Sequence, residues 1–118
     1  MGAPEMLRSV ADFKQIQGQS RSRAQPTLLM RYRRNELDRT RYGISTGRRV
    51  GNAVIRNTVR RRLRAILRKL EGQVEPGWDI LLVARPAAAQ APQADLEQAF
   101  ERMMSSAGLL RSPATGTN

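Results

Sequence analysis

The sequence predicts one domain that combines helices with a small β-sheet. Its 118 residues, 40% of them hydrophobic, are enough for one modest core and too few for two domains. Segments with strand-like alternation are interspersed with segments of helical periodicity. In the middle of the chain the order is strand, helix, strand, which indicates a parallel pair of strands.

A short helix is expected near the N-terminus, over residues 9–17. Ser9 and Asp12 resemble a capping box with Asp in place of Glu, and apolar residues follow at helical spacing. Phe13 would lie on this helix, where its ring could either anchor the core or stack on a nucleobase. Residues 18–26 are polar and basic, which indicates a loop or an irregular edge strand.

The next two segments are expected to be strands that form a hairpin. Residues 27–34 and 41–46 alternate apolar and polar side chains, and residues 35–40 would supply the turn. Tyr42 and Ile44 would share one face of the second strand. The basic residues of the first strand would face outward or lie at its end: Arg31, Arg33 and Arg34.

The most informative stretch is residues 48–70, which hold nine of the 21 Lys and Arg residues and no acid. A helix is expected over residues 55–70. Its apolar residues fall into one stripe that should pack on a core, namely Ile55, Val59, Leu63, Ile66 and Leu70. Its basic residues gather with one Asn on the opposite side, namely Asn57, Arg60, Arg61, Arg64 and Arg68, and are flanked by Arg56 and Arg62.

This charge pattern favours a polyanionic partner over a simply solvated helix. Solvated helix faces usually intersperse Glu with Lys, whereas here like charges repel one another without local compensation. Asn52 is the expected N-cap, Gly51 would allow a tight backbone approach, and the amides at this end could hold a phosphate. The helix is expected to stop at Glu71-Gly72, with Gly72 in a left-handed conformation.

The rest of the chain predicts a buried strand and a last helix. Residues 78–84 are almost continuously apolar, which indicates a strand covered on both faces. Residues 95–107 return to helical spacing. We therefore expect a single domain over residues 1–110 and a disordered tail over 111–118.

The composition argues against catalysis by the protein itself. The chain has no Cys and no His, which removes thiol nucleophiles, the usual general base and the common zinc ligands. No metal site and no catalytic residue are therefore expected. The net charge is +11, and no apolar run is long enough to span a bilayer or to serve as a secretory signal, so a cytoplasmic location is expected.

The order of these pieces resembles the protein component of bacterial ribonuclease P. The resemblance covers about Asp12 to Leu110 and is strongest from Tyr42 to Pro86. The residues that carry it are Gly43, Ser45, Arg48, Arg49, Val50, Gly51, Asn52, Ala53, Val54, Arg56, Asn57, Arg60, Arg61, Arg64, Asp79, Ala84, Arg85 and Pro86.

The resemblance implies an α+β domain with a mixed four-stranded sheet and three helices, related to a domain of a small-subunit ribosomal protein. It implies a left-handed strand-helix-strand crossover, against the general rule for parallel connections. It also implies the RNA-binding subunit of an endonuclease that removes the 5′ leader from precursor tRNA. The catalytic RNA subunit would be the partner, with one protein for each RNA, and would hold the Mg²⁺ ions.

The resemblance assigns two sets of binding residues. The basic helix and the loop before it would bind RNA through Arg48, Arg49, Asn52, Arg56, Asn57, Arg60, Arg61, Arg64 and Arg68. A leader-binding cleft would contain Phe13, Lys14 and Tyr32. Two positions depart from the family: Thr58 replaces the last Arg of an Arg-Asn-Arg signature, and Gln17 replaces a second aromatic residue.

Two other classes of protein share some of these features. A structural protein of the ribosome would also be small, basic and rich in arginine. An amphipathic helix on an anionic membrane would also be cationic, but the apolar stripe lacks Trp and Phe and is needed for the fold.

Overall fold

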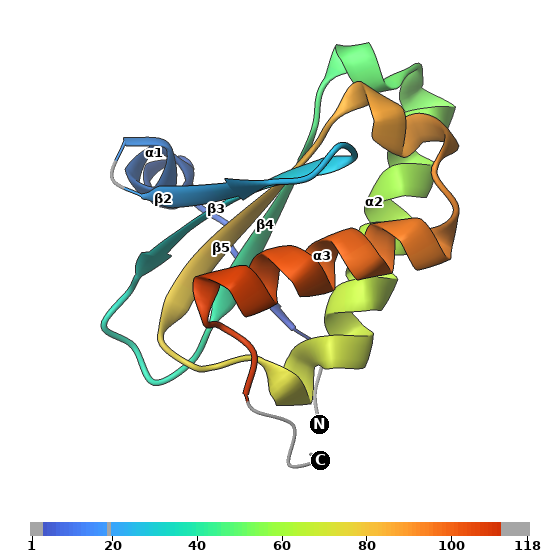
Figure 1. Cartoon of the computed structure of the whole chain (residues 1–118). Coiled ribbons are helices and arrows are strands. Elements are labelled where there is room, and N and C mark those ends of the chain that lie inside the picture. The colour runs from blue at the N-terminus through green and yellow to red at the C-terminus, as the bar shows by residue number, and fades with distance from the viewer. Residues whose placement is uncertain (1–3, 19, 112–118) are drawn as a thin grey trace, which may run out of the picture.

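A computed structural model describes residues 4–18 and 20–111, which form a five-stranded sheet with helices on both faces (Figure 1). The strands are β1 (Glu5–Met6), β2 (Arg21–Ala24), β3 (Leu28–Arg34), β4 (Arg41–Thr46) and β5 (Trp78–Ala84). The helices are α1 (Val10–Gly18), α2 (Ala53–Leu70) and α3 (Gln93–Ala107), with short 3₁₀ helices η1 (Arg48–Val50), η2 (Glu71–Gln73) and η3 (Pro86–Gln90).

The sheet is mixed, with strand order β1-β4-β5-β3-β2. β4 runs parallel to β5, with Tyr42 opposite Ile80, so the predicted parallel pair is confirmed. β3 runs antiparallel to both β5 and β2. The α+β class and the three helices are also confirmed, although the short edge strand β1 adds a fifth strand to the four expected. The left hand of the β4–α2–β5 crossover stays a prediction.

The predicted hairpin between residues 27–34 and 41–46 is wrong. β5 lies between these two strands and pairs with both of them. Its side chains explain this position, because Ile80, Leu81 and Leu82 are all buried and only a central strand is covered on both faces. β3 forms its hairpin with β2 instead, in a segment that the sequence suggested to be a loop or an irregular edge.

Helices cover the two faces of the sheet unequally. α2 and α3 cover one face and bury the larger core against it (Figure 1). This core includes Leu63 and Phe100 of the helices and Met30 and Tyr42 of the strands. α1 covers the other face with a small cluster: Leu7, Ile16 and Leu81, with Phe13 and Val83 packed against it. We call this second side the α1 face.

Two of the three predicted helix termini have the expected geometry. The Ser9 Oγ accepts a hydrogen bond from the Asp12 amide (3.0 Å), and the Asn52 Oδ1 accepts one from the Ile55 amide (3.0 Å). The left-handed Gly72 is wrong. α2 continues into η2, whose hydrogen bond from the Val74 amide to the Glu71 carbonyl (3.3 Å) ends the helix without a left-handed residue.

The expected tail lies mostly outside the described residues, which end at Arg111. The Arg111 amide donates a hydrogen bond to the Gln73 carbonyl (2.6 Å), and the Glu75 amide donates one to the Leu109 carbonyl (2.8 Å). These bonds join the last described residues to the segment that follows α2, and the domain boundary at residue 110 stays a prediction.

Candidate nucleic-acid interface

The helix α2 buries one face and exposes a cationic one, as predicted. Val59, Leu63, Ile66 and Leu70 are buried, and Leu67 widens the packed stripe. The opposite side exposes Asn57, Arg61, Arg64 and Arg68, while Arg60 is half-buried. We call this exposed side the cationic face of α2.

Charges on the cationic face have no acidic partners within the described residues. None of the ion pairs there involves Arg60, Arg61, Arg64 or Arg68. Arg60 Nη1 donates only to the Asn57 Oδ1 (2.7 Å). Lys69, by contrast, lies at the end of the helix and pairs with Glu97 (2.8 Å), so its hydrogen bond raises the pKa of its ammonium group. Four guanidinium groups therefore remain available for phosphate oxygens.

Two residues of α2 are used within the fold rather than on the cationic face. Arg62 Nη1 donates to the Ala91 carbonyl (3.0 Å), and the Arg62 carbonyl accepts from Gln93 Nε2 (3.1 Å), which fixes α2 to the start of α3. Thr58, the departure from the family signature, bonds the Val54 carbonyl through its Oγ1 (3.0 Å). Thr58 therefore adds no group that could replace the missing third cation.

The N-terminal end of α2 extends this interface. Arg48 and Arg49 are exposed on η1, Arg56 is half-buried on the first turn, and no acid lies in that turn. Gly51 has φ +152°, and a Cβ added there would lie 2.9 Å from the Ile55 Cγ2, so only glycine fits this approach. The positive end of the helix dipole and nearby guanidinium groups therefore lie together at this end, an arrangement that favours anions.

The α1 face brings an aromatic residue together with arginines. The Phe13 ring is half-buried and lies on Gly43, where an added Cβ would be 2.8 Å from the ring Cε1, and Lys14 is exposed. Arg31 and Arg33 come from β3 onto this same face, because Arg31 is opposite Leu81 in the strand register. The sequence pattern alone did not place these two arginines in a site, although strand alternation separates them from Met30 and Tyr32.

Tyr32 does not join Phe13 as expected. It is 2% exposed and belongs to the core on the side of α2 and α3, opposite the α1 face. Its ring lies 5.8 Å from that of Trp78. The two aromatic residues that were expected to share a cleft therefore lie on opposite faces of the sheet.

A buried carboxylate holds the arginines at one end of the α1 face. Asp79 accepts hydrogen bonds from Arg41 Nε (2.9 Å) and Nη2 (2.8 Å) and from Asn35 Nδ2 (2.9 Å). Arg33 Nη1 lies 3.7 Å from its Oδ2, and Arg41 also lies 3.5 Å from Asp12 of α1. The hydrogen bond with Asp79 is the main cause that raises the pKa of Arg41.

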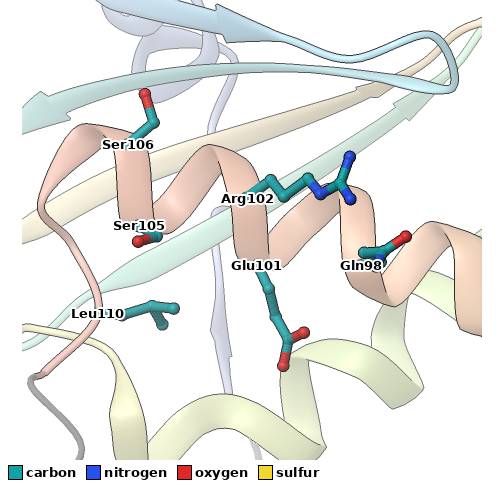
Figure 2. A pocket seen from close by; sticks show the side chains of 6 residues that line it. All are labelled: Gln98, Glu101, Arg102, Ser105, Ser106 and Leu110. Carbon is teal, nitrogen blue, oxygen red and sulfur yellow. The ribbon is translucent and has the colours of Figure 1, made fainter.

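A further hollow in the surface, along α3, has no excess of basic residues for a nucleic acid. This hollow of about 520 Å³ is lined by Gln98, Glu101, Arg102, Ser105, Ser106 and Leu110 (Figure 2). Its one acid and one base point in different directions. Within the described residues there is no group of three or more acids that could hold a metal ion, and no helix is long and apolar enough to cross a membrane.

An α+β domain with one uncompensated cationic helix and a second basic, aromatic face is an RNA-binding module by its fold and surface. Comparison with known proteins identifies its family. The ribonuclease P family model matches residues 1–108, and the chain belongs to that family.

Sequence and structural relatives agree with this assignment. The ribonuclease P protein component of Syntrophomonas wolfei is 34% identical over 103 residues, which is 87% of either chain. That of Symbiobacterium thermophilum is 36% identical over 106 residues, 89% of this chain and 92% of the relative. The solved RNase P protein of Staphylococcus aureus has a TM-score of 0.82 at 26% identity and covers 90% of this chain and 97% of its own.

Proposed function

We propose that this chain is the RNA-binding protein subunit of a ribonuclease P, the endoribonuclease that removes the 5′ leader from precursor tRNA. The observation that carries the proposal is the cationic face of α2, which is free of acidic partners within the described residues, on a fold of this family. The ribosomal alternative is not favoured, because the relatives are ribonuclease P proteins over nearly their whole length.

In this proposal the RNA subunit carries the chemistry. Mg²⁺ held by the RNA would activate water and stabilise the leaving oxygen. The described residues of this chain include no acidic cluster fit to hold that ion, so we assign no metal ligand to the protein. The protein contributes guanidinium groups that neutralise phosphates and so favour the association of the catalytic RNA with precursor tRNA. We place this complex in the cytoplasm, with one protein for each catalytic RNA.

We assign the cationic face of α2 and its N-terminal end to the catalytic RNA, and the α1 face to the leader. The half-buried ring of Phe13 gives one stacking surface, and Lys14, Arg31 and Arg33 supply charge beside it. Gln17 is exposed on the same helix and offers no second ring. A leader would therefore be held more by its phosphates than by its bases.

The proposal is tested by removing charge from the cationic face. Changing Arg60, Arg61 and Arg64 together to Gln should leave the fold intact, because the buried stripe lies on the other side of the helix. If the three groups contact phosphates, the slope of log affinity against log salt for a ribonuclease P RNA should fall by about 2 to 3.

Leader cleavage by the reconstituted complex at low Mg²⁺ should fall together with this affinity. Arg102→Gln, which removes an exposed arginine from α3, is the control and should change neither the slope nor cleavage. A triple variant with native circular dichroism and an unchanged salt slope would refute the assignment.

A further inference from the structure

A second aromatic and basic pocket lies at one corner of the sheet, and its two aromatic residues belong to the face opposite α1. It has a volume of about 450 Å³, within the range of small-ligand sites. Its lining residues are Ser20, Arg21, Tyr32, Arg33, Arg34 and Trp78, none of which is acidic. Neither the cationic face of α2 nor Phe13 contributes to this lining.

The strand register builds this pocket at one corner of the sheet. Arg21 of β2 lies opposite Tyr32 of β3, and Arg34 at the end of β3 lies opposite Trp78 at the start of β5. The two aromatic rings lie side by side, 5.8 Å apart and tilted by 58°. Three paired strands supply all of the lining residues except Ser20, which directly precedes β2.

Each ring in this corner is already matched with a guanidinium group. The Arg34 Cζ lies 5.3 Å from the centre of the Trp78 ring, and the Arg23 Cζ lies 5.7 Å from that of Tyr32. Arg23 is held there by a hydrogen bond from its Nε to the Ser106 Oγ at the last turn of α3 (2.9 Å). Arg34 is exposed and makes no ion pair in the described part of the chain, so it can turn from the ring toward a ligand.

The chemistry of this corner fits one class of ligand. A half-buried indole offers a flat surface to a nucleobase, and Arg21 and Arg34 beside it offer charge to the attached phosphate. An acidic peptide would use the arginines but leave the indole without a role. A flat apolar ligand would use the indole but leave the arginines unmatched.

We propose that this corner is a second nucleotide-binding site, which takes one unpaired nucleotide of an RNA by stacking its base on Trp78 and binding its phosphate with Arg21 and Arg34. The inference rests on the proposed function only in one respect, namely that the protein binds RNA. The nucleotide belongs either to the catalytic RNA or to precursor tRNA, which share this chemistry.

The chain reports on this site directly, because Trp78 is its only tryptophan. The probe is a single-stranded adenine pentanucleotide titrated into the full-length protein, with the tryptophan emission recorded beside the anisotropy of a labelled oligonucleotide. Saturable quenching is expected, whereas inorganic phosphate and a blunt RNA duplex should not quench.

Arg34→Ala and Arg21→Ala should each weaken binding of the pentanucleotide, measured by the quenching, about 3- to 10-fold, as expected for the loss of one typical hydrogen-bonded contact. Arg102→Ala removes the same charge from α3, outside the pocket, and should leave the transition unchanged. Variants at Trp78 lack the tryptophan signal and are measured by anisotropy alone. Trp78→Phe should retain most of the affinity for the pentanucleotide, and a folded Trp78→Ala should lose most of that affinity.

Titrations with two other RNAs identify the source of the nucleotide. Quenching on addition of ribonuclease P RNA alone would assign it to the catalytic RNA, and quenching that appears only with precursor tRNA would assign it to the substrate. In the triple Gln variant of the cationic face, the pentanucleotide should still quench the Trp78 emission. A failure of the site beside Trp78 can therefore be distinguished from a failure of the cationic face. An emission that stays constant while the anisotropy saturates, or equal losses in the Arg34, Arg21 and Arg102 variants, would overturn the proposal.

Discussion

Among the described residues, Asp79 is the only charged residue that is buried, and its loss should destabilise the fold. Its side chain is 1% exposed, and it is the acceptor for both Arg41 and Asn35. In Asp79→Ala, Arg41 loses the two hydrogen bonds that offset its burial. Asn35 keeps a second acceptor, the Arg39 carbonyl, so the penalty falls mainly on Arg41.

The size of the loss follows from the exposure of the partner. Breaking a buried ion pair by removing one member costs about 3 to 5 kcal/mol, because the remaining charge is uncompensated. The Arg41 side chain is 20% exposed and has Asp12 at 3.5 Å, so it can be partly resolvated and paired again. We expect a loss of about 3 kcal/mol in the free energy of unfolding, measured by urea denaturation at neutral pH.

Two further variants test this reasoning. Asp38→Ala removes an acid whose side chain is 95% exposed and should cost less than about 0.5 kcal/mol. The double variant Asp79→Ala with Arg41→Ala should lose clearly less than the sum of the two single losses, because the stranded charge is gone. A loss below about 1 kcal/mol for Asp79→Ala, or strict additivity in the double variant, would refute the account.

Two other predictions concern aromatic residues on the two sides of the sheet. Burial, followed by the negative charge of Glu71, raises the pKa of Tyr42 well above its ordinary value, so above pH ~10 only the unfolded phenol ionises. Stability should therefore fall by about 1.4 kcal/mol more in the wild type than in Tyr42→Phe between pH 9 and 11; equal losses in urea melts would contradict this. Phe13→Ala should weaken binding of precursor tRNA to the reconstituted enzyme by about 1 kcal/mol and leave mature tRNA unaffected, because only the precursor has a leader to stack. Equal losses for both tRNAs, with a large drop in stability, would instead make Phe13 a core residue.

Local features of this fold could be predicted because short-range chemistry decides them. The strands at 41–46 and 78–84 begin and end where the sequence indicated, and the Ser9 and Asn52 caps form as expected. The cationic face of α2 followed from helical spacing alone. Each of these depends on residues within one or two turns of each other.

Strand order could not be predicted in the same way. Proximity along the chain favoured a hairpin between β3 and β4, but β5, most of whose residues are buried, lies between these two strands at the centre of the sheet. The error at Tyr32 has a different origin. Alternation along β3 separates Tyr32 from Arg31 and Arg33, but which set faces α1 depends on the packing of helices far away in sequence.

The central place of β5 also explains how so small a domain can present several basic surfaces. Both faces of β5 are covered by helices, so β3 is held between β5 and the edge strand β2. β3 directs Arg31 and Arg33 toward α1, and it brings Tyr32 and Arg34 to the corner beside Trp78. Meanwhile α2 is anchored by its own stripe and exposes its charge away from the sheet. Phe13 packs in the small cluster on the α1 face, Trp78 packs at the edge of the larger core, and the cationic residues of α2 belong to neither cluster. Substitutions at these three places should therefore have additive effects on RNA affinity. Strong coupling between them would mean that the RNA binds one continuous surface, rather than surfaces on both sides of the sheet.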